Sequence, residues 1–194
     1  MKIILASKSP RRKQLLQRFN LTFEVVDSNL DESSVLKMTD PRNYCSKLAS
    51  MKADIVSKQF RDELIIGADT IVVLNKTIIE KPKDKSEAFK SLKKLSGSSH
   101  SVLTGVCLKS INHNIHQTFI AQTKVEFRNL EDSEINFYID NYKPYDKAGS
   151  YGIQDASSVF VKYINGCYDN VVGLPISKLH KELKKLNINL LEAN

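Results

Sequence analysis

The chain starts with a short apolar run that leads directly into a helix. Ile3–Ala6 has the composition of a buried strand, Ser9 is a good N-cap, and Pro10 is pre-set for the first helical position. A strand followed at once by a helix is the building unit of α/β proteins. The remaining sequence agrees with this fold class, because strand-like and helix-like segments alternate along it without a repeat or a low-complexity linker.

The first turn of this helix combines hydroxyl and basic side chains, namely Ser7, Ser9, Arg11 and Arg12. The unpaired N–H groups and the positive dipole end of a helix N-terminus favour an anion, and arginine can hold two phosphate oxygens at once. This predicts a phosphate-binding turn; the alternative is a capped helix with a solvated basic face. Because cations oppose the dipole here, removing Arg12 should leave the free protein equally stable or slightly more stable.

Hydrophobic spacing and turn residues predict the other elements. Helices are expected over residues 10–19, from 41 onward, over 86–95 and 131–141, and from 175 onward. Strands are expected over 23–26, 64–66, 71–74, 77–79, 100–108, 116–127 and 157–164. The pairs 71–74 with 77–79 and 100–108 with 116–127 should form hairpins. For residues 170–175 the sequence leaves two alternatives, a strand-to-helix turn and a catalytic segment.

Composition limits the class of protein. The 194 residues, 41% of them hydrophobic, can build a core as a single domain over 1–194. A net charge of +7 suits an anionic partner without separating nucleic acid from nucleotide. Cys45, Cys107 and Cys167 lack CxxC spacing, so they are expected to be buried apolar residues and not a disulfide framework or a zinc site. No segment has the length of a membrane span or a signal core, which favours the cytoplasm.

Asp69 is the strongest single candidate for chemistry. It ends an apolar strand and precedes Thr70 in G-A-D-T, where a carboxylate can hold a divalent metal or take a proton from water. The alternative is an Asp that caps its own turn. Glu32 could add a second metal ligand, or be an exposed loop acid. Lys52 and Lys81 could hold phosphate oxygens if the elements converge, or be surface lysines.

A second distinctive segment is D-K-A-G-S-Y-G-I-Q, from Asp146 to Gln154. Its two glycines permit close backbone approach. Gln154 can read a base edge or close hydrogen bonds within the loop, and Tyr151 can stack on a base or fill the core. The signatures GxxxxGK[ST], GxGxxG and GxSxG are absent from the sequence, which argues against kinase, dinucleotide-binding and serine-hydrolase functions.

Taken together, these segments resemble the Maf family of nucleoside triphosphate pyrophosphatases along nearly the whole chain. The matching segments are L-A-S-K-S-P-R-R-K-Q-L-L from Leu5, D-E at Asp31, K-L-A-S-M-K-A from Lys47, G-A-D-T at Gly67, K-P at Lys81, L-S-G-S-S-H-S-V-L-T-G-V from Leu95, D-K-A-G-S-Y-G-I-Q from Asp146 and N-V-V-G-L-P from Asn170. The resemblance implies an elongated, mixed and twisted sheet flanked by helices, with two lobes around a central cleft, as in inosine-triphosphate pyrophosphatases, and often a homodimer.

The implied reaction is hydrolysis of a nucleoside triphosphate to the monophosphate and pyrophosphate with Mg²⁺ or Mn²⁺, in a nucleotide-sanitation role. By resemblance, Asp69 is the proton acceptor that activates the attacking water, and Glu32 helps to place the metal, to which Asp69 can also be a ligand as argued above. The residues implied to bind substrate are Ser9, Arg11, Lys52 and Lys81 for the triphosphate and Arg12, Thr70 and Gln154 for substrate choice. The form of the Gln154 segment resembles the branch that acts on dTTP and UTP.

Two residues depart from the family pattern: Glu80 and Asp155 stand where glycine is usual. Asp155 adds a negative charge beside the implied base reader. Two other functions are considered. One is a non-catalytic nucleic-acid-binding or septation-regulating protein. The +7 charge favours this function, but the sequence has no recognition-helix motif or basic stripe. The other is a pyrophosphatase for noncanonical purine triphosphates. No stable nucleic acid or membrane partner is expected.

Overall fold

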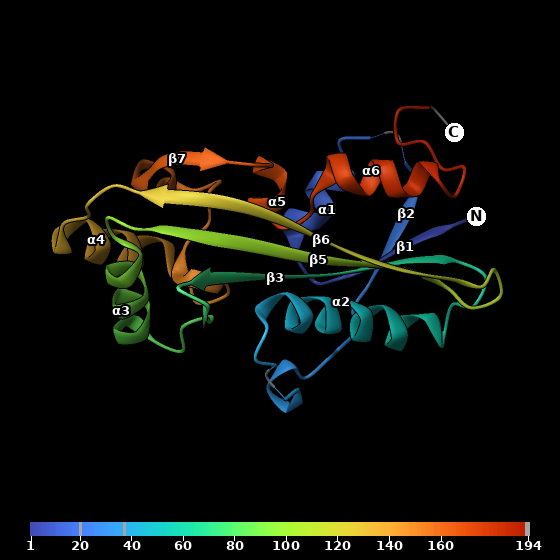
Figure 1. Ribbon diagram of the computed structural model, residues 1–194, viewed down its shortest axis with the longest axis horizontal. Coiled ribbons are helices and arrows are strands. Elements are labelled where there is room, and N and C mark those ends of the chain that lie inside the picture. Colours follow the sequence, from blue (N-terminus) through green and yellow to red (C-terminus); the bar gives the residue numbers. More distant parts are fainter. Residues whose placement is uncertain (20, 37, 193–194) are drawn as a thin grey trace. The chain divides into compact units, whose positions relative to one another are not determined.

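The computed structural model describes residues 1–19, 21–36 and 38–192, which form an α/β fold (Figure 1). The strands are β1 (Ile3–Ala6), β2 (Phe23–Val26), β3 (Leu64–Leu74), β4 (Thr77–Ile79), β5 (Ser99–Ser110), β6 (Ile115–Phe127) and β7 (Val161–Asn165). The helices are α1 (Pro10–Leu16), α2 (Pro41–Ser57), α3 (Lys85–Leu95), α4 (Asp132–Tyr142), α5 (Tyr168–Val172) and α6 (Ile176–Lys184), with 3₁₀ turns η1 (Glu32–Ser34), η2 (Ala148–Ser150) and η3 (Ala156–Phe160).

The strands form a seven-stranded mixed sheet in the order β2-β1-β3-β5-β6-β7, with β4 paired to β3. Strand β1 is parallel to both β2 and β3, so Ile3 lies opposite Phe23 on one side and Leu64 on the other. β3 and β4 are antiparallel across Asn75 and Lys76, which have φ of 49° and 67°, as a tight hairpin turn requires. The predicted mixed α/β class and this hairpin are confirmed. β5 and β6 are neighbours, as predicted.

The chain divides into two compact units. The first contains Met1–Asp69, Thr104–Ala121 and Gly173–Asn194, and the second contains Thr70–Leu103 and Gln122–Val172. Strands β3, β5 and β6 contribute residues to both. None of the helices in the described ranges is long and apolar enough to cross a bilayer.

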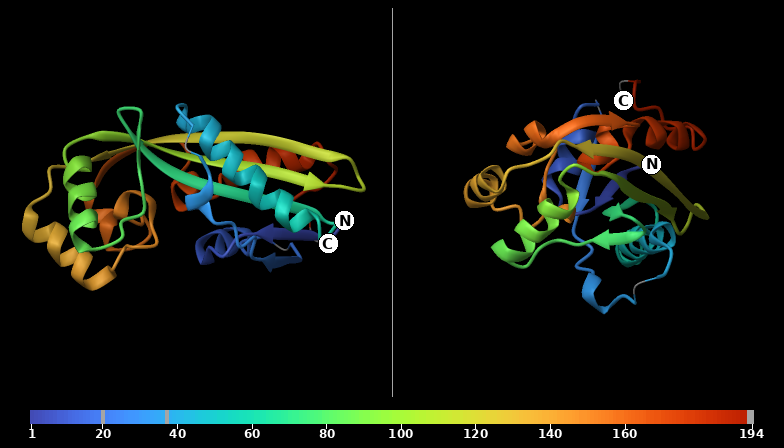
Figure 2. Two further views of the ribbon diagram at one scale, coloured as in Figure 1. Left: turned by 90° about the horizontal axis from the view of Figure 1, so that it is seen from below. Right: turned by 60° about the vertical axis from the view of Figure 1, so that its left-hand side comes forward.

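In the first unit, α2 covers one face of the strands, and α1 and α6 lie on the other side (Figures 1 and 2). The buried cluster under α2 consists of Ile4, Ala6, Ala49, Ala53, Val56, Ile65 and Cys107. The sequence predicts a buried face through Tyr44, Leu48, Met51 and Ile55. Tyr44 and Leu48 are buried, but Met51 and Ile55 are only partly buried, because the helix turns its small residues toward the sheet.

In the second unit, α3 and α4 lie side by side (Figure 2) and are joined by exposed ion pairs. The core of this unit is aromatic. Tyr151 is 5% exposed and makes edge contacts with Phe127 and His100 at centroid distances of 4.9 and 5.5 Å. Tyr151 therefore fills the core and is not free to stack on a base. His100 shares a hydrogen bond with the Tyr151 hydroxyl, and burial lowers the pKa of His100 to about 4.

Several local predictions are wrong. The expected strands over 64–66 and 71–74 are one continuous strand, β3, so Asp69 lies within a strand rather than at the end of one. Residues 157–160 are not strand, because the Asp155 side chain accepts the N–H of Ser157 and starts η3, so β7 begins only at Val161. Residues 170–172 belong to helix α5 rather than to a strand-to-helix turn. Cys45 and Cys107 are buried as predicted, whereas Cys167 is only partly buried.

Candidate active site

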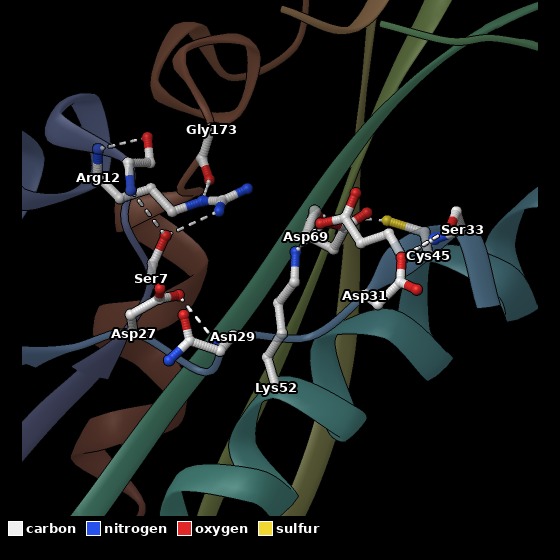
Figure 3. A network of polar contacts seen from close by, with 12 residues as sticks. Ser7, Arg12, Asp27, Asn29, Asp31, Ser33, Cys45, Lys52, Asp69 and Gly173 are labelled. Carbon is white, nitrogen blue, oxygen red and sulfur yellow. Dashed lines mark hydrogen bonds and ion pairs between the residues drawn. The ribbon is translucent and has the colours of Figure 1, made fainter. Parts of the chain in front are cut away.

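Lys52 lies between two carboxylates in the first unit (Figure 3). Its Nζ is 2.6 Å from Asp69 Oδ1 and 2.6 Å from Glu32 Oε1. The side chains of Lys52, Asp69 and Glu32 are 10%, 7% and 34% exposed. Lys52 is therefore not a surface lysine, and Glu32 is not a freely solvated loop acid. Helix α2, strand β3 and turn η1 bring these three residues together. For each residue, the sequence analysis had left a role in the site and a purely structural role as alternatives.

The close approach of α2 to β3 explains how Lys52 reaches Asp69. Lys52 lies between Ala49 and Ala53 on the helix, and Gly67 has no side chain to hold the helix away: a Cβ there would lie 2.4 Å from the Ala49 carbonyl oxygen. Side chains two residues apart on a strand share a face, so Asp69 points toward the same helix as Gly67. The glycine of G-A-D-T thus serves the packing that brings Lys52 and Asp69 together.

Cys45 supports the backbone of Asp69. Its Sγ donates to the Asp69 carbonyl at 3.3 Å and accepts the Gly105 N–H at 3.1 Å. Burial raises the pKa of Cys45 to about 12, so the thiol keeps the proton that it donates. The sequence analysis missed this role, because an isolated cysteine on a helix face looks like any small core residue.

Arg12 is turned into the first unit and not toward solvent. Its Nε donates to the Gly173 carbonyl at 2.8 Å, its Nη1 donates to Ser7 Oγ at 3.0 Å, and its own N–H donates to Ser9 Oγ at 3.4 Å (Figure 3). The last bond is the predicted N-cap. Burial lowers the pKa of the Arg12 guanidinium. Arg11, beside it, is partly buried.

Because of these contacts, we expect the removal of Arg12 to destabilise the protein, whereas the helix dipole alone predicts no loss of stability. We predict that Arg12→Ala lowers the free energy of unfolding by about 2 kcal/mol, because the hydrogen bonds that the charged guanidinium donates to the Gly173 carbonyl and to Ser7 Oγ are lost. Urea unfolding measures this. Lys13→Ala, at an exposed position of the same helix, is the control and should change little. An unchanged urea midpoint for Arg12→Ala would instead support the expectation from the sequence, that Arg12 does not stabilise the free protein.

The other three predicted site residues belong to the second unit. Thr70 follows Asp69 directly on β3, so its side chain points to the opposite face of the strand. Lys81 lies just after β4 and Gln154 lies between η2 and η3, and both are exposed. The structure thus assembles Glu32, Lys52 and Asp69, and also Ser9 with Arg12, within the first unit. The two groups interact, because the negative charge of Asp69 partly offsets the lowering of the Arg12 pKa by burial.

Glu32 and Asp69 are suited to a divalent cation. Each places an oxygen 2.6 Å from the same positively charged atom, Lys52 Nζ, so the two carboxylates already converge on a cation. Carboxylate oxygens are the ligands that Mg²⁺ and Mn²⁺ prefer. Among the described residues, no group of three or more His, Cys, Asp or Glu side chains could hold a metal. Two carboxylates therefore fit an ion that takes its remaining ligands from substrate phosphates and water, as Mg²⁺ commonly does.

Comparison with known proteins gives consistent matches. The family model described as "Maf-like protein" matches residues 2–186. A dTTP/UTP pyrophosphatase of Thermosipho africanus is 50% identical over 179 residues, which cover 92% of this chain and 90% of the relative. One from Ruminiclostridium cellulolyticum is 42% identical over 190 residues, covering 98% of each. The solved structure of a HAM1 protein from Coxiella burnetii has a TM-score of 0.46 at 17% identity, covering 66% of this chain and 73% of that one.

Proposed function

The chain belongs to the family of Maf-like proteins, and we propose that it hydrolyses dTTP and UTP to the monophosphate and pyrophosphate. The observation that carries this proposal is the cluster of Asp69, Lys52 and Glu32, in which the buried carboxylate of Asp69, a potential base, pairs with the buried ammonium group of Lys52. The relatives named dTTP/UTP pyrophosphatase support the substrate, because they match this chain over more than nine-tenths of its length. They also favour this function over the nucleic-acid-binding and purine-triphosphate alternatives.

In the proposed reaction Asp69 accepts a proton from the attacking water, since its carboxylate is held in place by Lys52 and its backbone by Cys45. Phosphoryl chemistry depends mainly on positioning and on charge placed near the phosphate oxygens. We assign that role to Lys52 and to the remaining predicted phosphate contacts, Ser9, Arg11 and Lys81. Arg12 and Thr70 would act in substrate choice, and Arg12 would do so from its buried position beside Gly173.

We further propose that Glu32 and Asp69 hold Mg²⁺ or Mn²⁺. When bound, such an ion would neutralise negative charge on the phosphate oxygens. A cytoplasmic location, a homodimer, a single functional domain over 1–194 and a role in nucleotide sanitation complete the proposal, and all four come from the family resemblance or the composition.

The experiment is pyrophosphate release from dTTP, UTP, CTP, ATP and GTP, with Mg²⁺ and with EDTA. We expect dTTP and UTP to be hydrolysed fastest and EDTA to remove the activity. Equal rates on all five nucleotides would contradict the substrate assignment and indicate a site that binds the phosphates alone. Full activity in EDTA would contradict the metal assignment.

Gln154 is the proposed reader of the base. Its amide can pair with the N3–H and a carbonyl of uracil or thymine, whereas cytosine lacks that N3–H donor. A site that pairs polar groups rejects an analogue that leaves them unsatisfied. We predict that Gln154→Ala narrows the ratio of kcat/KM for UTP over CTP, mainly by lowering the value for UTP. A ratio equal to the wild-type ratio would remove Gln154 from this role.

A further inference from the structure

One buried hydroxyl, that of Tyr138 on α4, forms hydrogen bonds with residues on both sides of Gln154, to the backbone of one and the side chain of the other. The hydroxyl accepts the N–H of Gly152 at 3.3 Å and donates to Asp155 Oδ2 at 3.2 Å. Gly152 lies two residues before Gln154 and Asp155 one residue after it. A hydroxyl has one proton to donate. Tyr138 donates this proton to Asp155, and its oxygen accepts the N–H of Gly152.

Further hydrogen bonds close the same short loop. Asp155 Oδ1 accepts the N–H of Ser157 at 3.0 Å, and the Asp155 N–H donates to the Gly152 carbonyl at 2.9 Å. That carbonyl also accepts the Ser157 hydroxyl at 2.8 Å. Gln154 therefore stands on a closed turn with its side chain exposed. The negative charge of Asp155, at a position where glycine is usual in the family, is engaged by Tyr138 and Ser157.

Tyr138 itself is firmly placed. Its side chain is 2% exposed, stacks on Tyr142 at a centroid distance of 5.3 Å, and meets Phe160 edge-on at 5.3 Å. Burial, together with the Asp155 carboxylate, raises the pKa of Tyr138, so the phenol keeps its proton. A ring packed on a helix is a more rigid support than a loop residue, and a base-reading amide discriminates only when its position is well defined.

We propose that Tyr138 is a positioning residue for base specificity: its hydroxyl ties Gly152 to Asp155 and so fixes the orientation in which Gln154 meets the base. This inference rests on the proposed function, in which Gln154 reads uracil or thymine. Tyr138 contacts no reacting atom and acts only through the turn. Its loss should therefore change the choice between pyrimidines and leave the cleavage of the triphosphate largely intact.

The first test is Tyr138→Phe, which removes the hydroxyl and keeps the packed ring. We expect the ratio of kcat/KM for UTP over CTP to fall roughly fivefold to tenfold, the effect of weakening one hydrogen bond. The change should lie mainly in KM for UTP, with little change for CTP. Tyr142→Phe, which removes a hydroxyl from a more exposed ring on the same helix, is the matched control and should leave the ratio unchanged. An unchanged ratio in folded Tyr138→Phe overturns the proposal.

The second test combines Tyr138→Phe with Gln154→Ala. If Tyr138 acts through Gln154, its substitution has no further effect on the UTP/CTP ratio once Gln154 is gone. Equal effects in both backgrounds overturn the positioning role. If Gln154→Ala alone leaves the ratio unchanged, base reading by Gln154 fails and the role of Tyr138 fails with it. If Gln154→Ala lowers the ratio and Tyr138→Phe does not, only the present proposal fails.

A second variant keeps the test decisive if Tyr138→Phe does not fold by circular dichroism. Asp155→Ala removes the acceptor of the Tyr138 hydroxyl, together with the oxygen that accepts the Ser157 N–H, and leaves the aromatic core in place. We expect it to lower the UTP/CTP ratio in the same direction, and an unchanged ratio in the folded variant overturns the proposal.

Discussion

Asp69→Asn should reduce dTTP hydrolysis by roughly 10²–10⁴-fold, the effect of losing a general base. Asparagine has nearly the same size, and its side-chain oxygen can still accept a hydrogen bond from Lys52, which lies 2.6 Å from Asp69 Oδ1. The fold should therefore persist while the proton acceptor and one proposed metal ligand are lost. The measurement is steady-state pyrophosphate release, with circular dichroism to show that the variant is folded.

Asp54→Asn provides a matched control for this result. Asp54 also bears a carboxylate paired with a lysine, Lys109, but its side chain is 40% exposed. Neutralising it should leave the rate unchanged. A folded Asp69→Asn protein with wild-type turnover would show that Asp69 is not the base.

The elements that the sequence predicts well are those set by local chemistry. Ser9 and Pro10 start α1, α2 begins at Pro41, and the Asn75-Lys76 turn closes the β3–β4 hairpin, all as expected. The start of α2 is also set locally, because the Asp40 side chain accepts the N–H of Arg42. Each depends on residues within a few positions of one another, so no tertiary contact is needed to predict it.

The site was harder to predict, because its features depend on contacts between distant segments. From its local sequence Lys52 looks like a surface lysine. It is buried because Gly67, on a strand distant in sequence, allows α2 to approach the sheet closely. Cys45 becomes a support for Asp69 only because β3 and β5 both pass beneath it. For Arg12, the dipole argument gave the wrong environment, since the Gly173 carbonyl that binds its guanidinium comes from the far end of the chain.

Lys52→Met should destabilise the protein strongly, by about 3–5 kcal/mol, because removing one partner of a buried ion pair leaves an uncompensated charge. Methionine keeps the length and the apolar stem of lysine but not its charge. Asp69, at 7% exposure, would then lie near Glu32 without the cation that now bridges them. Urea unfolding without divalent cations measures the loss. Activity should also fall, by roughly 10²–10³-fold, the usual effect of losing one preorganised charge partner of the transition state.

Lys109→Met is the matched control, since Lys109 pairs with Asp54 where both side chains are more exposed, at 22% and 40%. An exposed pair of this kind contributes about 1 kcal/mol or less, so a loss equal to that of Lys52→Met would contradict the importance assigned to burial.

Stabilisation by Mg²⁺ gives a second test of Lys52→Met. A ligand that binds only the folded state stabilises that state. If Glu32 and Asp69 bind Mg²⁺, the ion should stabilise Lys52→Met more than wild type, because it replaces the missing positive charge between the two carboxylates. Equal stabilisation of both proteins would place any bound Mg²⁺ elsewhere.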